Sequence, residues 1–195
     1  MTHQPLLFGI CGAPCTGKTT LSRMASRRLT VAGYHCEVLP ELARILTARG
    51  VKIDDAMGPA DYDAFLHAYD ERDAQLEAQV TLADRTPIDH YSYLAVNENA
   101  VPEQLANHQA HVLSAIKRYN LLFYLPIHFR MRDDGFRNTD PVYQEHLDNA
   151  IRKLLNLTDV PVVTLGADKR KRARLVVELI EGQLQNNQSA IGASK

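Results

Sequence analysis

The stretch Gly12-Ala-Pro-Cys-Thr-Gly17-Lys18-Thr19 decides how this 195-residue chain is expected to fold. It fits the pattern GxxxxGK followed by Ser or Thr in full, and an apolar run, Leu6–Cys11, stands directly before it. Apolar residues at helical spacing follow it from about Lys18. Glycines let backbone N–H groups curl around a polyphosphate, and a helix N-terminus adds the positive end of its dipole. The alternative is a tight glycine turn that binds nothing, and the strand and helix on either side argue against it.

The same stretch indicates which groups of a nucleotide are bound. Lys18 is expected to reach the β- and γ-phosphates of a nucleoside triphosphate, and the Thr19 hydroxyl is expected to ligate Mg²⁺. The cofactors that the sequence predicts are therefore ATP and Mg²⁺. Cys15 lies inside the loop as a small residue whose thiol is made more reactive by a nearby helix N-terminus.

Short apolar runs alternate with amphipathic segments along the whole chain. The runs expected to be strands are 6–11, 36–39, 79–83, 121–125 and 161–165. The segments expected to be helices are 18–32, 41–49, 60–76, 88–96, 103–119, 143–155 and 175–184, with loops over 51–59, 84–89 and 128–140. Continuous apolar runs are typical of strands buried on both faces of a parallel sheet. We therefore expect an α/β protein, a three-layer P-loop fold with about five parallel strands, whose order spacing alone does not fix.

The composition is that of an ordinary globular protein, with 45% hydrophobic and 23% charged residues. It excludes disordered and collagen-like chains. The length fits a single domain, which we place at residues 1–186, with a flexible tail over 187–195. The formal net charge of −1 argues against binding nucleic acid over a whole face and leaves room for a local basic patch.

The cysteines and the apolar runs indicate where the protein works. Cys11, Cys15 and Cys36 are odd in number and have no metal-binding spacing, which argues for free thiols in a reducing compartment. The N-terminal segment has no basic region before its apolar run, so it does not fit a secretory signal. No apolar stretch approaches the ~20 residues that span a bilayer. We expect a soluble cytoplasmic protein without membrane contacts.

Polar residues after the second and third expected strands are the next candidates, because ligands of open parallel sheets bind beyond the carboxyl ends of the strands. Glu41 is expected to hold or deprotonate an acceptor hydroxyl, and its alternative is a helix-start glutamate paired with Arg44. Asp84 is expected to anchor Mg²⁺, and Arg85 to contact a phosphate or the acceptor. The alternative there is a helix cap at Asp84 or Thr86, which leaves Arg85 unexplained.

Two basic segments follow the fourth and fifth expected strands. Arg130, Arg132 and Arg137 lie in the polar loop 128–140, which we expect to fold over the triphosphate as an arginine-rich lid. The alternative is a solvated loop with surface ion pairs. The run 168–174 would touch the nucleotide base or nucleic-acid phosphates, and its alternative is the exposed start of a helix.

Three further residues carry less information. Asp89 is a carboxylate in the first turn of an expected helix, which is common. His108 and His111 are three residues apart on a helix, and the sequence gives them no matching carboxylate or cysteine. We therefore predict no metal site at these histidines.

Four segments together resemble a known group of proteins. GAPCTGKTTL, PELAR, LADRTPID and DDGFR followed by a helix are similar to the P-loop kinase-like group that includes nicotinamide riboside kinase domains. The resemblance covers roughly residues 6–184 and implies a small-molecule kinase fold related to deoxynucleoside and thymidylate kinases. By this similarity Glu41 matches the glutamate after strand two, Asp84 and Arg85 match the Asp-Arg pair after strand three, and Arg137 matches the lid arginine. A related branch, in bacterial viruses, phosphorylates hydroxymethyluracil bases within DNA.

The sequence therefore predicts an ATP- and Mg²⁺-dependent phosphotransferase acting on a hydroxyl of a nucleoside- or nucleotide-type acceptor. Two alternatives stay open: a kinase of hydroxymethyluracil bases in phage DNA, and an ATPase or switch module with no small-molecule acceptor. The expected catalytic residues are Lys18, Glu41, Asp84, Arg85 and Arg137. The expected nucleotide ligands are Gly12, Ala13, Pro14, Cys15, Thr16, Gly17, Lys18, Thr19, Thr20, Arg130 and Arg132. The expected metal ligands are Thr19 and Asp84.

Overall fold

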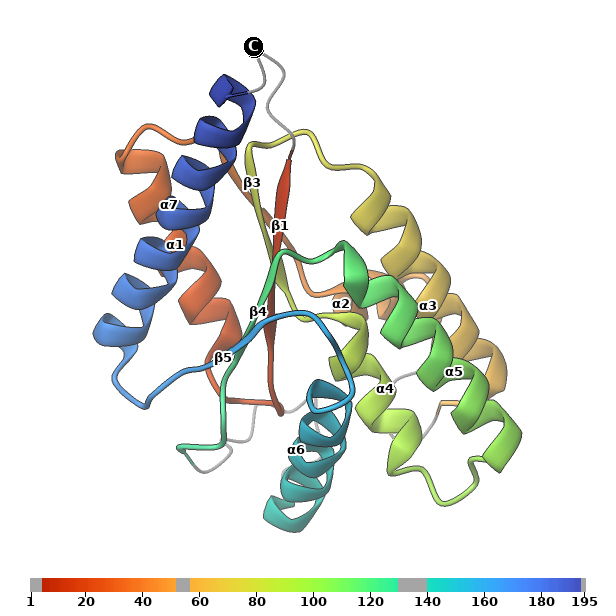
Figure 1. The fold of residues 1–195 in the computed structure, drawn as a ribbon. Coiled ribbons are helices and arrows are strands. Elements are labelled where there is room, and N and C mark those ends of the chain that lie inside the picture. The colour runs from red at the N-terminus through yellow and green to blue at the C-terminus, as the bar shows by residue number, and fades with distance from the viewer. Residues whose placement is uncertain (1–4, 52–56, 130–139, 194–195) are drawn as a thin grey trace.

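The computed structural model describes residues 5–51, 57–129 and 140–193, and its centre is one parallel sheet (Figure 1). The five strands stand in the order β2-β3-β1-β4-β5, and every neighbouring pair is parallel. Their bounds are Leu6–Cys11 (β1), Cys36–Leu39 (β2), Val80–Asp84 (β3), Leu121–Tyr124 (β4) and Val162–Thr164 (β5). Each lies within one residue of the apolar run that predicts it, and the expected α/β fold is confirmed.

Helices cover both faces of the sheet, so the domain has three layers (Figure 1). On one face lie α1 (Lys18–Val31) and α7 (Lys169–Ala193). The helices on the other side are α2 (Leu42–Ala48), α3 (Pro59–Ala74), α4 (Pro87–Ala95), α5 (Pro102–Ala115) with the 3₁₀ turn η2 (Ile116–Arg118), and α6 (Pro141–Leu155).

The alternation of side chains along β1 builds both layers of the core. Phe8 and Ile10 pack with residues of α1 and α7, whereas Leu7 and Cys11 pack with residues of α4, α5 and α6. All six residues of β1 are buried, as expected of a central strand. Gly9 has a steric role, because a Cβ there would lie 2.6 Å from side-chain atoms of both Leu122 and Thr86.

The strand order brings separate parts of the sequence to one edge. β1 lies between β3 and β4, with Ile10 opposite Asp84 and Cys11 opposite Tyr124. β2 pairs with β3, so the segments that follow these two strands also meet. Because all strands are parallel, the loops after β1, β2 and β3 gather at their carboxyl ends.

Helix boundaries differ from the expected ones where caps decide them. α4 begins at Pro87, inside the expected loop, because Thr86 and Asp89 form a capping box. α7 begins at Lys169, six residues before the first apolar residue used to predict it. The Asp168 carboxylate accepts hydrogen bonds from the N–H groups of Arg170 and Lys171 at 2.8 and 2.9 Å, which starts the helix early.

Two expectations bear on partners and on domain limits. Among the described residues no helix combines the length and apolarity needed to cross a bilayer. The limits of the domain, 1–186, stay a prediction.

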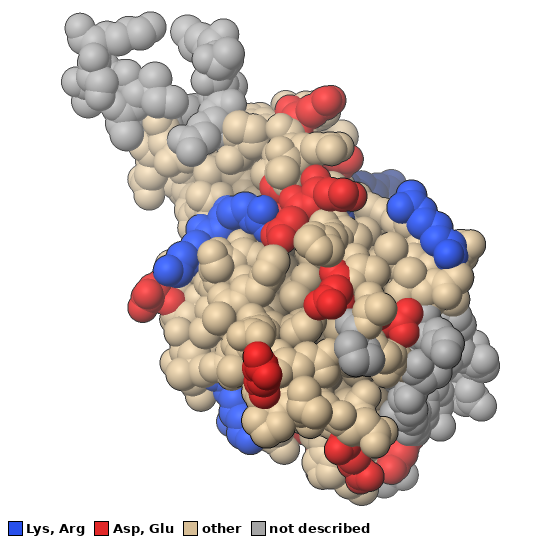
Figure 2. All heavy atoms as spheres, turned by 90° about the vertical axis from the view of Figure 1, so that its right-hand side faces the viewer, with Lys and Arg blue, Asp and Glu red and all other residues tan. Residues whose placement is uncertain are grey.

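Figure 2 shows the face formed by α3 and α5, where acidic side chains are scattered and the described residues form no continuous basic patch.

Candidate active site

The loop between β1 and α1 has the backbone shape that its glycines allow. Gly12 and Gly17 have φ angles of 149° and 94°, and Cys15, at 62°, is left-handed as well. A Cβ at Gly12 would lie 2.4 Å from the carbonyl oxygen of Leu125, so a larger residue has no room there. The loop is thus fixed by sterics, and its following residue, Lys18, is the first of α1.

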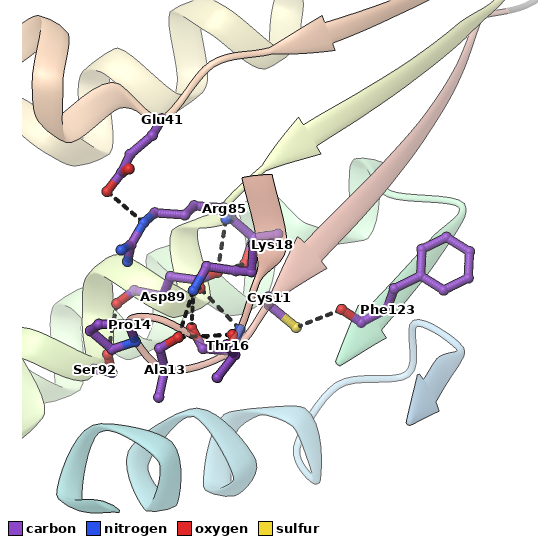
Figure 3. A network of polar contacts seen from close by, with 12 residues as sticks. Cys11, Ala13, Pro14, Thr16, Lys18, Glu41, Arg85, Asp89, Ser92 and Phe123 are labelled. Atoms are coloured by element: carbon purple, nitrogen blue, oxygen red, sulfur yellow. Dashed lines mark hydrogen bonds and ion pairs between the residues drawn. The ribbon is translucent and has the colours of Figure 1, made fainter. Parts of the chain in front are cut away.

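Lys18 folds back over its own loop (Figure 3). Its Nζ donates to the carbonyl oxygens of Gly12 and Ala13 at 2.5 and 2.8 Å, and it lies 3.6 Å from Asp89 Oδ1. The side chain is buried, and this burial lowers the pKa of Lys18 to about 8. An ammonium group forms stronger hydrogen bonds with an anion than with neutral carbonyl groups. Lys18 can therefore exchange these two carbonyl oxygens for an anionic partner.

Asp89 ties the loop to α4. Its Oδ1 accepts from the backbone N–H of Gly12 at 3.0 Å, and its Oδ2 accepts from the N–H and the hydroxyl of Thr86, both at 2.9 Å. The sequence predicts an acidic residue of a first helical turn, and the structure confirms that position. The link to Gly12 is beyond sequence reasoning, because the two residues are 77 positions apart.

Thr19 and Asp84 meet at the same edge of the sheet. The Thr19 hydroxyl donates to the Asp84 carboxylate, and burial raises the pKa of Asp84 above its ordinary value. Both line a pocket of about 740 Å³ together with Glu41. The other lining residues are Ser22, Arg23, Val38, Pro40 and Ile45. The two expected metal ligands and the expected acceptor ligand therefore share one pocket.

Glu41 and Arg85 form an ion pair across the ends of β2 and β3 (Figure 3). Arg85 Nε lies 2.7 Å from Glu41 Oε1, with the side chains only 7% and 10% exposed. Arg85 has a φ of 80°, which costs a residue with a side chain about 1–3 kcal/mol and is found most often at functional sites. Glu41 is also the N-cap residue of α2, as the helix-start alternative expects, although its side chain does not cap the helix. The Arg44 side chain, its expected partner in that alternative, lies outside the described part of the structure.

The capping alternative for this segment holds only in part. Thr86 is the N-cap of α4 and Pro87 is its first residue. Asp84 ends β3 and does not cap the helix. Arg85 is the residue between them, and its N–H donates to the Ile10 carbonyl at 3.1 Å.

Two buried polar side chains from the second half of the chain also contact the loop. Gln144 of α6 donates to the Pro14 carbonyl at 2.6 Å. Arg172 of α7 donates to the Thr16 carbonyl at 3.3 Å, and its Nη2 lies 2.7 Å from the place of a Cβ on Gly17. Arg172 Nε is buried and has no hydrogen-bond partner among the residues that the structure describes.

Sequence analysis does not assign these two residues. Gln144 stands on the apolar face of α6, three residues before Leu147, and a polar residue in that stripe is a signal that was available. Arg172 belongs to the basic run 168–174, in which it is buried whereas Lys169, Arg170 and Lys171 are exposed. The run is thus the start of a helix with one side chain turned toward the loop.

The predicted arginine-rich lid lies outside the described residues. Arg130, Arg132 and Arg137 lie in the segment 130–139, of which the structure describes nothing.

The prediction for the histidine pair needs a correction. His108 and His111 do have matching carboxylates, which the sequence pattern does not reveal because they come from α3. The Nε2 atoms lie 3.2 Å from Asp63 Oδ1 and 2.7 Å from Asp70 Oδ2, respectively.

The strand order, the loop before α1 and the acidic residue at the end of β3 define a P-loop nucleotide-binding protein with a nucleoside-kinase-like fold. More narrowly, the chain belongs to the AAA domain family, whose sequence profile matches residues 7–172. No curated protein matches the sequence significantly.

Solved structures share this fold at low sequence identity. A deoxyadenosine kinase from M. mycoides, with products dCMP and dCDP bound, is 18% identical with a TM-score of 0.65, over 91% of this chain and 99% of that chain. The NadR protein in complex with NR is 21% identical with a TM-score of 0.65, over 83% of this chain and 45% of that chain. YorR from Bacillus subtilis, in complex with phosphorylated GDP, is 13% identical with a TM-score of 0.55, over 92% of this chain and 98% of that chain.

These neighbours confirm the predicted resemblance at the level of a P-loop, nucleoside-kinase-like fold. None of the three gives support to the viral DNA-kinase branch.

Proposed function

We propose that the protein transfers the γ-phosphate of ATP to a hydroxyl group of a nucleoside- or nucleotide-type acceptor. The observation that carries the proposal is the buried Glu41–Arg85 pair, whose glutamate lines the same pocket as Thr19 and Asp84. Glu41 can accept the proton of a hydroxyl that enters this pocket, and Arg85 beside it supplies positive charge. The deoxyadenosine kinase among the fold neighbours, which has nucleotides bound, supports the same class of reaction.

ATP is proposed to bind along the loop from Gly12 to Thr20. Backbone N–H groups of the loop and the N-terminus of α1 hold the phosphates. Lys18 leaves the carbonyl oxygens of Gly12 and Ala13 and pairs with the β- and γ-phosphates. Arg137, with Arg130 and Arg132, is proposed to add positive charge at the γ-phosphate.

Thr19 and Asp84 fit a magnesium ion. Both offer oxygen atoms, which Mg²⁺ prefers, and the hydrogen bond between them places the two side chains within reach of one ion. Mg²⁺ bound there would neutralise the charge that develops on the β- and γ-phosphate oxygens. Binding would also keep Asp84 ionised, against the effect of its burial.

The residues at the pocket can supply each part of the transfer step. The acceptor hydroxyl binds to Glu41, which takes its proton while the acceptor oxygen forms a bond to the γ-phosphorus. The bond from that phosphorus to the β–γ bridging oxygen breaks, and ADP leaves with the electron pair. Arg85 orients Glu41 before the step and stabilises the transferred phosphoryl charge during it.

The proposal is tested with γ-labelled ATP, Mg²⁺ and a panel of acceptors. The panel contains free nucleosides, nicotinamide riboside, nucleoside monophosphates, and duplex DNA with and without hydroxymethyluracil. We expect label on a nucleoside or a nucleotide. Label on modified DNA alone would assign the protein to the DNA-kinase alternative, and label released only as free phosphate would favour an ATPase or a switch module.

The pKa of Lys18 predicts the direction in which the affinity for ATP changes with pH. Its pKa is about 8 in the free protein, and the triphosphate raises that pKa, so binding takes up a proton near and above this pH. Affinity is therefore expected to fall as the pH rises through about 8. Calorimetry in two buffers of different ionisation enthalpy measures the uptake, which we expect to be larger at about pH 8.5 than at about pH 7.5. Equal uptake at both would contradict the assignment to Lys18.

Arg172 is expected to contribute to nucleotide affinity. Arg172→Ala removes the guanidinium that packs on Thr16 and Gly17, and we expect the KM for ATP to rise about tenfold, ~1.4 kcal/mol, with less effect on the KM of the acceptor. The matched control is Arg174→Ala, because Arg174 is 70% exposed and pairs with Glu178 of the same helix at 3.6 Å. An Arg172→Ala enzyme with the parental KM for ATP would reduce Arg172 to a packing role.

A further inference from the structure

We infer that Arg72 of α3 is a positioning residue that sets the geometry of the Glu41–Arg85 pair, an inference that rests on the proposed phosphotransfer. Arg72 Nη1 donates to the carbonyl oxygen of Pro40, the residue directly before Glu41, at 3.5 Å. Arg72 Nη2 donates to the carbonyl oxygen of Arg85, also at 3.5 Å. One guanidinium therefore joins the two backbone segments that carry the pair.

Arg72 is itself held in one orientation. Its Nε donates to Asp73 Oδ1 at 2.8 Å, and its Nη2 also contacts the Tyr119 hydroxyl at 3.2 Å. That hydroxyl donates to Asp73 Oδ2 at 2.5 Å, which closes a ring of three side chains. The guanidinium carbon lies 4.7 Å from the ring centroid of Tyr69, within the range of a cation–π contact.

Burial makes this network stiff. The side chains of Arg72 and Asp73 are 9% and 0% exposed, so their charges are poorly screened by water. Charge-assisted hydrogen bonds in such surroundings are stronger and shorter than those between neutral groups. Arg72 thus differs from a surface ion pair, which holds its partners loosely.

We call the two contacts of Arg72, with the carbonyl oxygens of Pro40 and Arg85, the brace. The backbone of Arg85 needs such contacts to keep its conformation. Its φ of 80° is unfavourable and persists only when neighbouring contacts hold it. On one side its N–H donates to the Ile10 carbonyl at 3.1 Å, and on the other its carbonyl accepts from Arg72. Glu41 has a matching need, because it follows β2, a four-residue strand at the edge of the sheet. The contact of Arg72 with Pro40 ties that edge to the segment after β3.

The test is Arg72→Lys, which keeps the charge beside Asp73. Lysine has one ammonium group and no planar fork, so it cannot bridge both carbonyl oxygens and hold Asp73 at once. We expect kcat for transfer to fall about tenfold and the KM for ATP to change less than about twofold. Unchanged kcat in a variant that melts like the parent would overturn the inference.

A double-variant cycle separates positioning from general loss of structure. If Arg72 acts through the pair, adding Arg72→Lys to Glu41→Gln costs much less than it costs the parent enzyme. If its role is unconnected with the pair, the two fold-losses multiply, and the inference is wrong.

Amide hydrogen exchange tests the brace without relying on activity. Arg72→Lys is expected to speed exchange at the N–H of Arg85, because the residue loses the contact on its own carbonyl oxygen that helps to hold its backbone conformation. Arg118→Lys is the matched control. Arg118 Nη2 lies 2.5 Å from Asp70 Oδ1, so Arg118 links η2 to α3, but its side chain is 35% exposed, and its hydrogen bonds within the described part of the chain are to Asp70 and Ala115. Unaltered exchange at Arg85 in Arg72→Lys would refute the brace, whereas a parent enzyme that transfers no label would refute the proposed function alone.

Discussion

Lys18→Ala is expected to lower phosphoryl transfer about 10³-fold or more, because no other described side chain of the loop carries a positive charge to the β- and γ-phosphates. The protein is expected to stay folded. Asp89 lies 3.6 Å from the Lys18 ammonium, but its oxygens also accept from Gly12 and Thr86, so the carboxylate keeps its hydrogen bonds when the lysine is removed. Turnover is measured with labelled ATP, and folding with thermal unfolding.

The control for Lys18→Ala is Lys171→Ala, which removes an exposed positive charge from the start of α7. It is expected to transfer phosphate at the parental rate. If the Lys18→Ala enzyme still turned over at more than about a tenth of the parental rate, the loop would not have the role in phosphoryl transfer that we propose.

Glu41→Gln is expected to lower kcat about 10²- to 10⁴-fold while nucleotide binding is preserved. The amide has nearly the shape of the carboxylate and keeps an oxygen that accepts from Arg85, but it cannot take the proton of the acceptor hydroxyl. Because Glu41 follows β2 and is not part of the phosphate loop, the KM for ATP should change little. Steady-state kinetics with both substrates varied separates these effects.

The same substitution on β2, the strand that precedes Glu41, serves as a control. Glu37→Gln changes an exposed carboxylate of β2 and is expected to leave transfer unchanged. If Glu41→Gln also transferred at the parental rate, Glu41 would be a structural partner of Arg85, and another group would have to receive the proton.

The inner strands β1, β3 and β4 are predictable because strands that are buried on both faces of a sheet have short, continuous apolar runs in the sequence. Residues 6–11 and 36–39 are strands with the predicted bounds, and 121–125 and 161–165 lose only end residues. The phosphate loop is equally visible, because its backbone shape needs glycine at Gly12 and Gly17.

The contacts of the site are much less predictable. Glu41 meets Arg85 only because β2 lies next to β3, and no spacing rule gives that order. Arg72 is 13 residues from Arg85 and 32 from Pro40, and in sequence it is an ordinary charged residue of an amphipathic helix. Sequence reasoning thus finds the residues that end strands and misses those that reach the site from helices.

Helix caps account for two further differences, at the starts of α4 and α7. Asp168 and Thr86 start α7 and α4 earlier than the apolar spacing suggests, since caps act before the first buried residue. The start of α7 matters for the site, because it sets the helical turn from which Arg172 reaches the loop.

The central claim is that the γ-phosphate goes to an acceptor and not to water. The most direct test is the ratio of phosphorylated acceptor to ADP, measured in one reaction of the parent enzyme with labelled ATP and the best acceptor of the panel. Transfer predicts one molecule of phosphorylated acceptor for each ADP, with little ADP formed when the acceptor is left out. ADP that forms at the same rate with and without every acceptor, accompanied only by free phosphate, would contradict it.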